Sequence, residues 1–295
     1  MSGVCVVAEI GCNHKGNIDI AKQMIRKIAE INRSDSLGRI YAVKFQKRTN
    51  KILLSPAEYN APHPNPVHAY GTTYGAHREF LEFTVEQHRE LKKYCEECGL
   101  VYSSSVWDII AAQEIVCMQP ELIKVPSACN TDIEMLEYLC RNFKGDIHVS
   151  LGMTRLQEER DLIEVFCKNN RLGSLVLYSC TSGYPVPAED ICLLEIQRLK
   201  RLYGNDVKGI GFSGHHLGTA IDIAAMTLGA QYIERHFTLD KTWKGTDHVA
   251  SLEPHELQKM MQDLETVNSA LKFKKCEILE IEKAQRKKLK RKISE

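Results

Sequence analysis

The feature that most constrains the fold is an alternation of short apolar runs with longer amphipathic stretches. The short runs are rich in β-branched residues and end in small or polar ones, as buried parallel strands do. Repeated βα units predict an α/β protein, and eight units predict a closed (β/α)8 barrel (TIM barrel) rather than an open, doubly wound sheet. The expected strands are Cys5–Gly11, Arg39–Gln46, Leu100–Val106, Leu122–Ser127, Asp146–Gly152, Ser174–Cys180, Gly209–His215 and Gln231–Phe237.

The stretches between these runs repeat apolar residues at helical spacing. A chain of 295 residues suits one such barrel, which usually needs about 250. We therefore expect a single-domain barrel over 1–272 and a basic C-terminal helix or tail over 273–295. The expected helices are Ile18–Asn32, Val85–Cys98, Asp132–Asn142, Leu156–Lys168, Leu193–Leu202, Leu217–Leu228 and Pro254–Leu271.

Charge and composition exclude several classes of protein. Lys and Arg total 39 against 38 Asp and Glu, so no global field attracts nucleic acid, and the basic run Arg286–Lys292 is typical of a solvated helix end. The N-terminus lacks the features of a signal peptide, and no apolar stretch approaches the roughly 20 residues of a membrane span. The 11 scattered cysteines indicate reduced thiols and a cytoplasmic protein. Cys95 and Cys98 form a C-x-x-C without a second pair, so zinc or redox use is the lesser alternative.

The segment Ser55–His77 interrupts the alternation after the second strand. It contains four prolines and three tyrosines. A βα loop of this length is usually a lid or a binding loop, so we expect it to fold over the mouth of the barrel.

Polar residues concentrate at the carboxyl ends of the expected strands, where a barrel places its active site. Several stand two residues apart and so share one face of a strand. The sequence therefore predicts one polar mouth. Its candidate members are Glu9, Asn13, His14, Lys44, Gln46, Ser103, Ser104, Ser105, Lys124, Ser127, Ser182, Tyr184, Ser213, His215, Glu234 and His236.

Two histidines and two lysines in this set each have two possible roles. His215 and His236 end adjacent strands about 4.8 Å apart, so they can share a metal, or they are two unrelated histidines. Lys44 and Lys124 lie within apolar strands, where a lysine needs a partner. They either form salt bridges with Glu9 or Glu234, or form an anion site with serine hydroxyls.

Glu9 and Asp247 are the carboxylates considered for proton transfer. A carboxylate near two lysines is expected to have a lowered pKa, which makes it a poor general acid. A carboxylate that contacts a phosphate instead would carry a proton part of the time.

Four blocks of the sequence resemble the sialic acid synthase (N-acetylneuraminate synthase) family. Residues 8–16 resemble its A-E-I-G-x-N-H-x-G opening, and 43–46 its V-K-F-Q. Residues 234–240 resemble E-[KR]-H-F-T-L-D, and 247–254 resemble D-H-x-[AF]-S-L-E-P. The resemblance implies a metal-dependent condensation of phosphoenolpyruvate with an N-acylated hexosamine such as N-acetylmannosamine, as in the synthesis of surface polysaccharides. Phosphate would leave by C–O cleavage.

The resemblance also implies roles for individual residues. His215 and His236 would bind the divalent metal, expected to be Mn²⁺ with Mg²⁺ or Co²⁺ as alternatives. Glu9, Lys44, Lys124 and Asp247 would be catalytic, with Glu9 handling protons. The residues expected to bind phosphoenolpyruvate are Lys44, Ser105, Lys124, Ser127, Ser182 and Ser213, and those expected to bind the acceptor are Gln46, Cys129, Tyr184, Glu234 and Asp247.

The sequence departs from the family pattern in three places. Cys129 stands where the family has an acceptor-binding glutamate, Ser182 where asparagine is common, and Gly214 where aspartate precedes the metal-binding histidine. We also expect no C-terminal antifreeze-like (SAF) domain, through which family members dimerise, so the chain would form a homodimer by another route or none at all. The segment Ser55–His77 would then take the place of that domain as a lid.

Other functions remain open on the residues alone. A synthase with a different acceptor (mannose, a phosphorylated sugar or a shorter aldose) is the first alternative. A barrel metallohydrolase and a catalytically inactive assembly partner are the others. The hydrolase would need three or more protein ligands per metal and no lysine pair.

Overall fold

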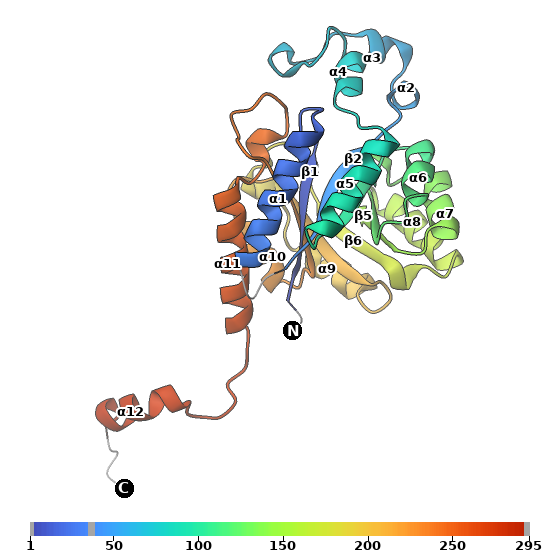
Figure 1. Cartoon of the computed structure of the whole chain (residues 1–295). Helices are drawn as coiled ribbons and strands as arrows, with labels where there is room; N and C mark the ends of the chain where they lie inside the picture. The colour runs from blue at the N-terminus through green and yellow to red at the C-terminus, as the bar shows by residue number, and fades with distance from the viewer. Residues whose placement is uncertain (1–2, 35–38, 292–295) are drawn as a thin grey trace.

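The computed structural model describes residues 3–34 and 39–291, and within these ranges eight parallel strands close into one barrel (Figure 1). Each strand pairs with its neighbours in chain order, and β1 pairs with β8. The (β/α)8 prediction is therefore confirmed over the open sheet. The strands are β1 (Cys5–Gly11), β2 (Arg39–Lys47), β3 (Val101–Val106), β4 (Leu122–Val125), β5 (Asp146–Ser150), β6 (Leu175–Cys180), β7 (Gly209–Gly214) and β8 (Tyr232–His236).

Helices surround the barrel, and seven of them correspond to predicted stretches. One outer helix, α6, was not predicted; its apolar run gives only a weak amphipathic pattern. The outer helices are α1 (Ile18–Ser34), α5 (Val85–Glu97), α6 (Ile109–Val116), α7 (Ile133–Asn142), α8 (Leu156–Lys168), α9 (Glu195–Tyr203), α10 (Ala220–Thr227) and α11 (Pro254–Ala270).

Strand β4 ends two residues earlier than predicted. Pro126 follows Val125, and proline has no N–H with which to continue a ladder. The next residues, Ser127–Cys129, form a 3₁₀ helix instead. This turn sets where Ser127 and Cys129 point, which matters for the site below.

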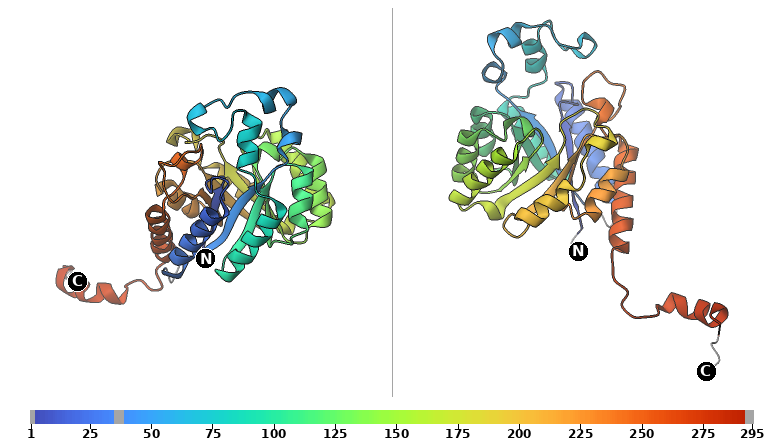
Figure 2. Two further views of the ribbon diagram at one scale, coloured as in Figure 1. Left: turned by 45° about the horizontal axis from the view of Figure 1, so that its top comes forward. Right: turned by 180° about the vertical axis from the view of Figure 1, so that it is seen from behind.

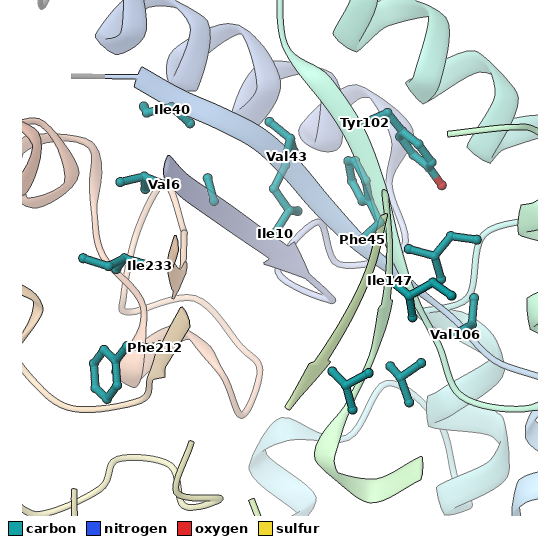
Figure 3. Close-up of a cluster of buried hydrophobic side chains, with 14 of the residues drawn as sticks. Val6, Ile10, Ile40, Val43, Phe45, Tyr102, Val106, Ile147, Phe212 and Ile233 are labelled. Atoms are coloured by element: carbon teal, nitrogen blue, oxygen red, sulfur yellow. The ribbon is translucent and has the colours of Figure 1, made fainter. Parts of the chain in front are cut away.

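The two faces of each strand have different surroundings. On β1, Val6 and Ile10 belong to the large apolar cluster between barrel and helices, which Figure 3 shows in close-up. The intervening Val7 belongs to a small separate cluster with Ala42 and Leu122 from other strands. This second cluster fills the barrel interior near the amino ends of the strands. The next inward positions along the same strands are polar, so the interior changes from apolar to charged toward the carboxyl ends.

The segment after β2 differs from the expected loop because it contains short helices. These are α2 (Asn50–Leu53), α3 (Pro56–Asn60) and α4 (Tyr74–Phe80), with a 3₁₀ turn at Pro66–His68. Their N-caps explain where they form: Ser55 and Glu58 make a capping box, and the Thr73 hydroxyl accepts from Ala76 N–H. Figure 1 shows these helices at the top of the molecule, beyond the carboxyl ends of the strands.

Two hydrogen bonds join this segment to the loop after β8. The Tyr70 hydroxyl donates to Lys244 O at 2.5 Å, and Gly245 N–H donates to His68 Nδ1 at 3.1 Å. The two loops are therefore held together at one side of the mouth.

At the other end of the chain, α12 (Glu280–Leu289) stands away from the barrel in all three views (Figures 1 and 2). The predicted basic helix is present, and residues 292–295 of the predicted tail lie outside the described residues. In the described parts of the chain, none of the helices has the length and apolar character needed to cross a bilayer.

Candidate active site

A cavity of about 320 Å³ opens at the carboxyl ends of the strands, and we call it the inner cavity. Its size suits a small metabolite. Trp107, directly after β3, also lines it and was not predicted. Of the residues predicted to act, those that line it are Glu9, Lys44, Gln46, Ser105, Lys124, Ser127, Ser182, Tyr184, Ser213, His215, Glu234 and His236.

Two buried lysines and two buried glutamates form the floor of the inner cavity. Lys44 Nζ lies 2.5 Å from Glu9 Oε2 and 3.7 Å from Glu234 Oε1. Lys124 Nζ lies 2.9 Å from Glu234 Oε2. Because β8 neighbours neither β2 nor β4, the two contacts made by Glu234 cross the barrel interior. The salt bridges considered for the lysines are therefore present.

Hydrogen bonds hold the floor in place. Lys44 Nζ donates to Ser105 Oγ at 2.7 Å, and Gln46 Nε2 donates to Glu9 Oε1 at 3.1 Å. Ser213 Oγ donates to Glu234 Oε1 at 3.2 Å. A buried polar group is expensive unless it is hydrogen-bonded, so these contacts fix the positions of both lysines.

The two glutamates differ in pKa, and for Glu9 the expectation of a lowered pKa near lysines is corrected. Burial raises the pKa of Glu9 above its ordinary value and outweighs the opposing effects of Lys44 and His236. Burial acts on Glu234 in the same direction, but Lys124 and Lys44 together hold its pKa well below the ordinary value. Glu9 is therefore the carboxyl in the floor that more readily takes a proton.

The two lysines also differ in pKa. Burial lowers the pKa of Lys124 despite Glu234. Burial acts on Lys44 in the same way, but Glu234 and Glu9 raise its pKa above the ordinary value. Lys44 thus remains a firmly charged ammonium group at the centre of the floor.

Beside the floor, Ser127, Ser182 and the backbone of Gly152 surround a small space. Gly152 N–H donates to Ser127 Oγ at 3.0 Å. A Cβ on residue 152 would lie 2.5 Å from Ser182 Oγ and 2.7 Å from Ser127 Oγ, so any larger residue there would displace both hydroxyls. The result is a cradle of hydroxyl and amide groups of the kind that holds an anion.

His215 and His236 lie together, with ring centroids 5.5 Å apart. Burial, with His236 beside it, lowers the pKa of His215 to about 3, so its ring is neutral at pH 7. His215 Nδ1 contacts Thr181 O at 3.1 Å, which places the proton on Nδ1 and leaves the Nε2 lone pair available.

The histidine pair fits a divalent metal. His236 Nδ1 is buried without a hydrogen-bond partner and lies 4.0 Å from Asp247 Oδ2. Metal ligands must be unprotonated nitrogens, and the free Nε2 lone pair of His215 beside the unpartnered Nδ1 of His236 suits that need. Within residues 3–34 and 39–291, no group of three or more His, Cys, Asp or Glu residues is arranged to hold a metal. Two protein ligands are therefore the set that the residues offer.

A second cavity of about 210 Å³, which we call the outer cavity, adjoins the first. Asp247 lines this cavity and not the inner one. Burial would raise the pKa of Asp247, but His236, Thr246 and Arg48 lower it. The residues shared by both cavities are Gln46, Trp107, Tyr184 and His236.

Cys129 is the predicted acceptor residue that the structure does not bring to the site. Its side chain is 8% exposed, and its thiol donates to Trp107 O at 3.1 Å. It lines neither cavity, because the 3₁₀ turn after Pro126 directs Ser127 toward the mouth and Cys129 behind it. Glu234, another predicted acceptor residue, instead contacts the two lysines.

The structure accounts for Gly214, where the family pattern has aspartate. A Cβ there would lie 2.8 Å from both His216 Cε1 and Phe212 Cε1. His216 occupies that space because it contacts the buried pair Arg235 and Asp222.

Sequence reasoning missed several residues that line the cavities, among them Arg48, Trp107 and Arg78. Arg48 stands two residues after Gln46. The alternation of side chains along β2, continued past the end of the strand, would have placed Arg48 on the same face as Gln46. Trp107 follows β3 directly. Arg78 comes from α4, and no strand-end signal marks it.

Comparisons with known proteins are consistent with this site. The human N-acetylneuraminate-9-phosphate synthase is 35% identical over 284 residues, covering 96% of this chain and 76% of that protein. The N,N'-diacetyllegionaminic acid synthase of Campylobacter jejuni is 32% identical over 272 residues, covering 92% and 78%. A crystal structure of N-acetylneuraminic acid (sialic acid) synthetase from Leptospira borgpetersenii, in complex with citrate, superposes with a TM-score of 0.80. It is 26% identical and covers 99% of this chain and 94% of that one.

A family model supports the same assignment over most of the barrel. The model described as the NeuB family matches residues 36–275. With that match and the relatives above, the chain belongs to the NeuB family.

Proposed function

We propose that this protein condenses phosphoenolpyruvate with an aldehyde sugar to give a nonulosonic acid and phosphate. The acceptor would be N-acetylmannosamine or a related hexosamine. The observation that carries the proposal is one cavity that joins two buried lysines and a hydroxyl cradle to a pair of adjacent histidines. Anionic phosphoenolpyruvate would contact the lysines and hydroxyls, and the aldehyde of the sugar would lie at the histidine pair.

The lysine side of the cavity would hold phosphoenolpyruvate. Its phosphate and carboxylate carry negative charge, and ammonium and hydroxyl groups are strong donors to such oxygens. Lys44 and Lys124 would supply the charge, and Ser127 and Ser182 the hydroxyls at the Gly152 cradle. Ser105 and Ser213 keep Lys44 and Glu234 in position.

The histidine side would receive the aldehyde. A divalent cation held by His215 and His236, with Mn²⁺ favoured over Mg²⁺ or Co²⁺, would supply Lewis-acid polarisation of the carbonyl. His215 is kept in the right tautomer by Thr181 O. Tyr184, whose ring centroid lies 4.3 Å from that of His215, covers this side and would position the acceptor.

In the reaction, C3 of phosphoenolpyruvate bonds to the aldehyde carbon, water adds at C2, and the C–O bond to phosphate breaks. The water loses both protons as C2 becomes a ketone: one goes to the aldehyde oxygen, and the other leaves with phosphate. Glu9 would handle these protons at its carboxylate, because its raised pKa allows it to hold a proton part of the time. Gln46 would orient Glu9 through the 3.1 Å contact.

The same floor and histidine pair would also serve a different acceptor, such as mannose, a phosphorylated sugar or a shorter aldose. The residues that decide between them lie in the outer cavity, where Asp247 and Gln46 would contact acceptor hydroxyls.

The test is phosphate release from phosphoenolpyruvate with Mn²⁺, with and without EDTA, across a panel of sugars. The panel contains N-acetylmannosamine, mannose, their 6-phosphates, diacetamido-hexoses and arabinose 5-phosphate. We expect metal-dependent release with at least one sugar and a product that incorporates that sugar. Absence of release with every sugar, in a protein that also binds no metal, would overturn the proposal.

A further inference from the structure

Beneath the floor of the inner cavity lies a buried ring that the proposed reaction does not use. Tyr178 on β6 lies two residues before Cys180, which lines the inner cavity, so the Tyr178 side chain points into the barrel one level below it. A Cβ at Gly211, on the neighbouring β7, would lie 2.6 Å from Tyr178 Cδ1. The absence of a side chain at Gly211 therefore leaves room for the ring.

The face of the Tyr178 ring lies against Lys124 of the floor. Lys124 Nζ is 4.0 Å from the ring centroid, and it also lies 2.9 Å from Glu234 Oε2. An aromatic ring attracts a cation placed over its face, and the attraction is stronger where water is excluded. Both Lys124 and Tyr178 are buried, so this contact is a strong one of its kind.

His148 on β5 holds the outer edge of the same ring. The Tyr178 hydroxyl and His148 Nδ1 share a buried hydrogen bond of 2.9 Å between neighbouring strands. Burial, with Lys124 nearby, lowers the pKa of His148 to about 3. The imidazole is therefore neutral at pH 7 and adds no charge beneath the ammonium. Because its hydroxyl is held at one end, the Tyr178 ring keeps its face toward Lys124.

The charge balance around Lys124 shows why a ring matters there. The charged and titratable groups that face Lys124 are Glu234 on β8, Lys44 on β2, His148 on β5, and Cys180 and Tyr178 on β6. Glu234 is the anion among them, but it also lies 3.7 Å from Lys44, which opposes a second positive charge. Burial raises the pKa of Cys180 and of Tyr178, so both are neutral. One carboxylate thus serves two ammonium groups, and the ring supplies further attraction for Lys124.

We infer that Tyr178 is a positioning residue for the donor substrate: its ring holds the Lys124 ammonium charged and in place for phosphoenolpyruvate, and His148 holds the ring. The inference rests on the proposed function, in which Lys124 binds that substrate. Without the ring, the charged form of Lys124 would lose part of its stabilisation in an equally buried place. The charge, and the donor affinity that needs it, would then be lost at lower pH.

The test measures the affinity for phosphoenolpyruvate by calorimetry from about pH 7 to about pH 10, toward the ordinary pKa of lysine. In the native protein, the affinity should fall as pH rises through the pKa of Lys124. In Tyr178→Leu, which removes the ring, this fall should move to lower pH by about one unit, because a desolvated contact between a cation and a ring is worth on the order of one pKa unit. Tyr178→Phe retains the ring and should move the fall much less.

Tyr232→Leu is the matched control. Tyr232 also lies close to His148, with ring centroids 5.1 Å apart, but the ring beneath Lys124 Nζ is that of Tyr178. The control should lower thermal stability without moving the pH at which affinity falls. If Tyr178→Leu does not fold, Tyr178→Met replaces it, because its flexible side chain fills more of the space. An unmoved fall in the variant that lacks the ring, or an equal shift in Tyr232→Leu, would overturn the inference.

A second measurement separates this inference from the proposed function. Nuclear magnetic resonance of isotope-labelled lysine follows the titration of the Lys124 ammonium directly, and the signal is identified by its loss in Lys124→Arg. A lower titration midpoint in Tyr178→Leu than in the native protein would support the role of the ring even if phosphoenolpyruvate does not bind, in which case the proposed function fails. Equal midpoints would overturn the inference whichever anion the floor binds.

Discussion

The inner and outer cavities are built in different ways. Inward-facing positions on β1, β2, β4 and β8 supply the charges of the inner cavity, and these charges neutralise one another. The outer cavity is formed by the helices after β2 and the loop after β8, and Arg78 Nε there is buried without a hydrogen-bond partner. In the proposed function, the strands fix groups that every turnover needs, while the loops carry groups that select the ligand. Substitutions should accordingly act on rate in the first region and on preference in the second.

The largest effect is expected from the histidine pair. His215→Ala or His236→Ala should lower kcat by about 10³-fold or more, since a bound metal contributes several kcal/mol of transition-state stabilisation. Each change should also weaken Mn²⁺ binding measured by calorimetry. His255→Ala, an exposed histidine on α11, is the control and should change neither quantity. Full activity of His236→Ala in the presence of EDTA would contradict the proposed role.

The next largest effect is expected from Glu9. Glu9→Gln keeps the size of the side chain but cannot carry a proton, so kcat should fall by about 10²-fold or more. KM for phosphoenolpyruvate should change little. Because burial raises the pKa of Glu9, activity that depends on its protonated form should fall as pH rises through that value, and the variant should lack this fall. A variant with unchanged kcat would show that Glu9 serves only to hold Lys44.

A smaller effect is expected at the hydroxyl cradle. Ser182→Ala should raise KM for phosphoenolpyruvate by about 10-fold, because one hydrogen bond to a charged group is lost. KM for the sugar should stay the same. Ser174→Ala, which changes a serine at the opposite end of β6, is the control. A rise in KM for the sugar instead would mean that phosphoenolpyruvate binds elsewhere in the cavity.

The smallest effect on catalysis is expected at Cys129. Because this thiol lies behind the cavity wall, Cys129→Ala should change KM for either substrate by less than about 2-fold. Cys129→Glu should lower the free energy of unfolding by roughly 1–3 kcal/mol, because it buries an unpaired polar group. Chemical denaturation and steady-state kinetics measure the two effects. A tenfold shift in acceptor preference in Cys129→Glu would mean that this position reaches the site after all.

The sequence predicted the site best where the alternation of side chains along a strand sets which residues point into the barrel. Glu9, Lys44, Lys124 and Glu234 were expected at one mouth because each ends an inward-facing run, and the structure brings all four together. The bounds of β1 were predicted to the residue, while β4 was predicted too long because the break at Pro126 was overlooked.

The rest depended on contacts that no local pattern encodes. Arg78 reaches the outer cavity because α4 folds back over the mouth, and its neighbour Trp107 comes from the residues directly after β3. The different pKa shifts of Glu9 and Glu234 depend on which lysine approaches which oxygen. Cys129 was expected at the site from its alignment with a glutamate, but the direction of its side chain is set by the turn after Pro126.

The central claim is that the donor and the metal occupy the inner cavity while the far end of the sugar enters the outer one. A crystal structure with Mn²⁺, phosphoenolpyruvate and an unreactive reduced acceptor, with anomalous data for manganese, tests it most directly. The account predicts an anomalous peak between His215 and His236, phosphoenolpyruvate against Lys44 and Lys124, and the sugar extending into the outer cavity. Phosphoenolpyruvate in the outer cavity, or manganese bound away from the histidine pair, would contradict it.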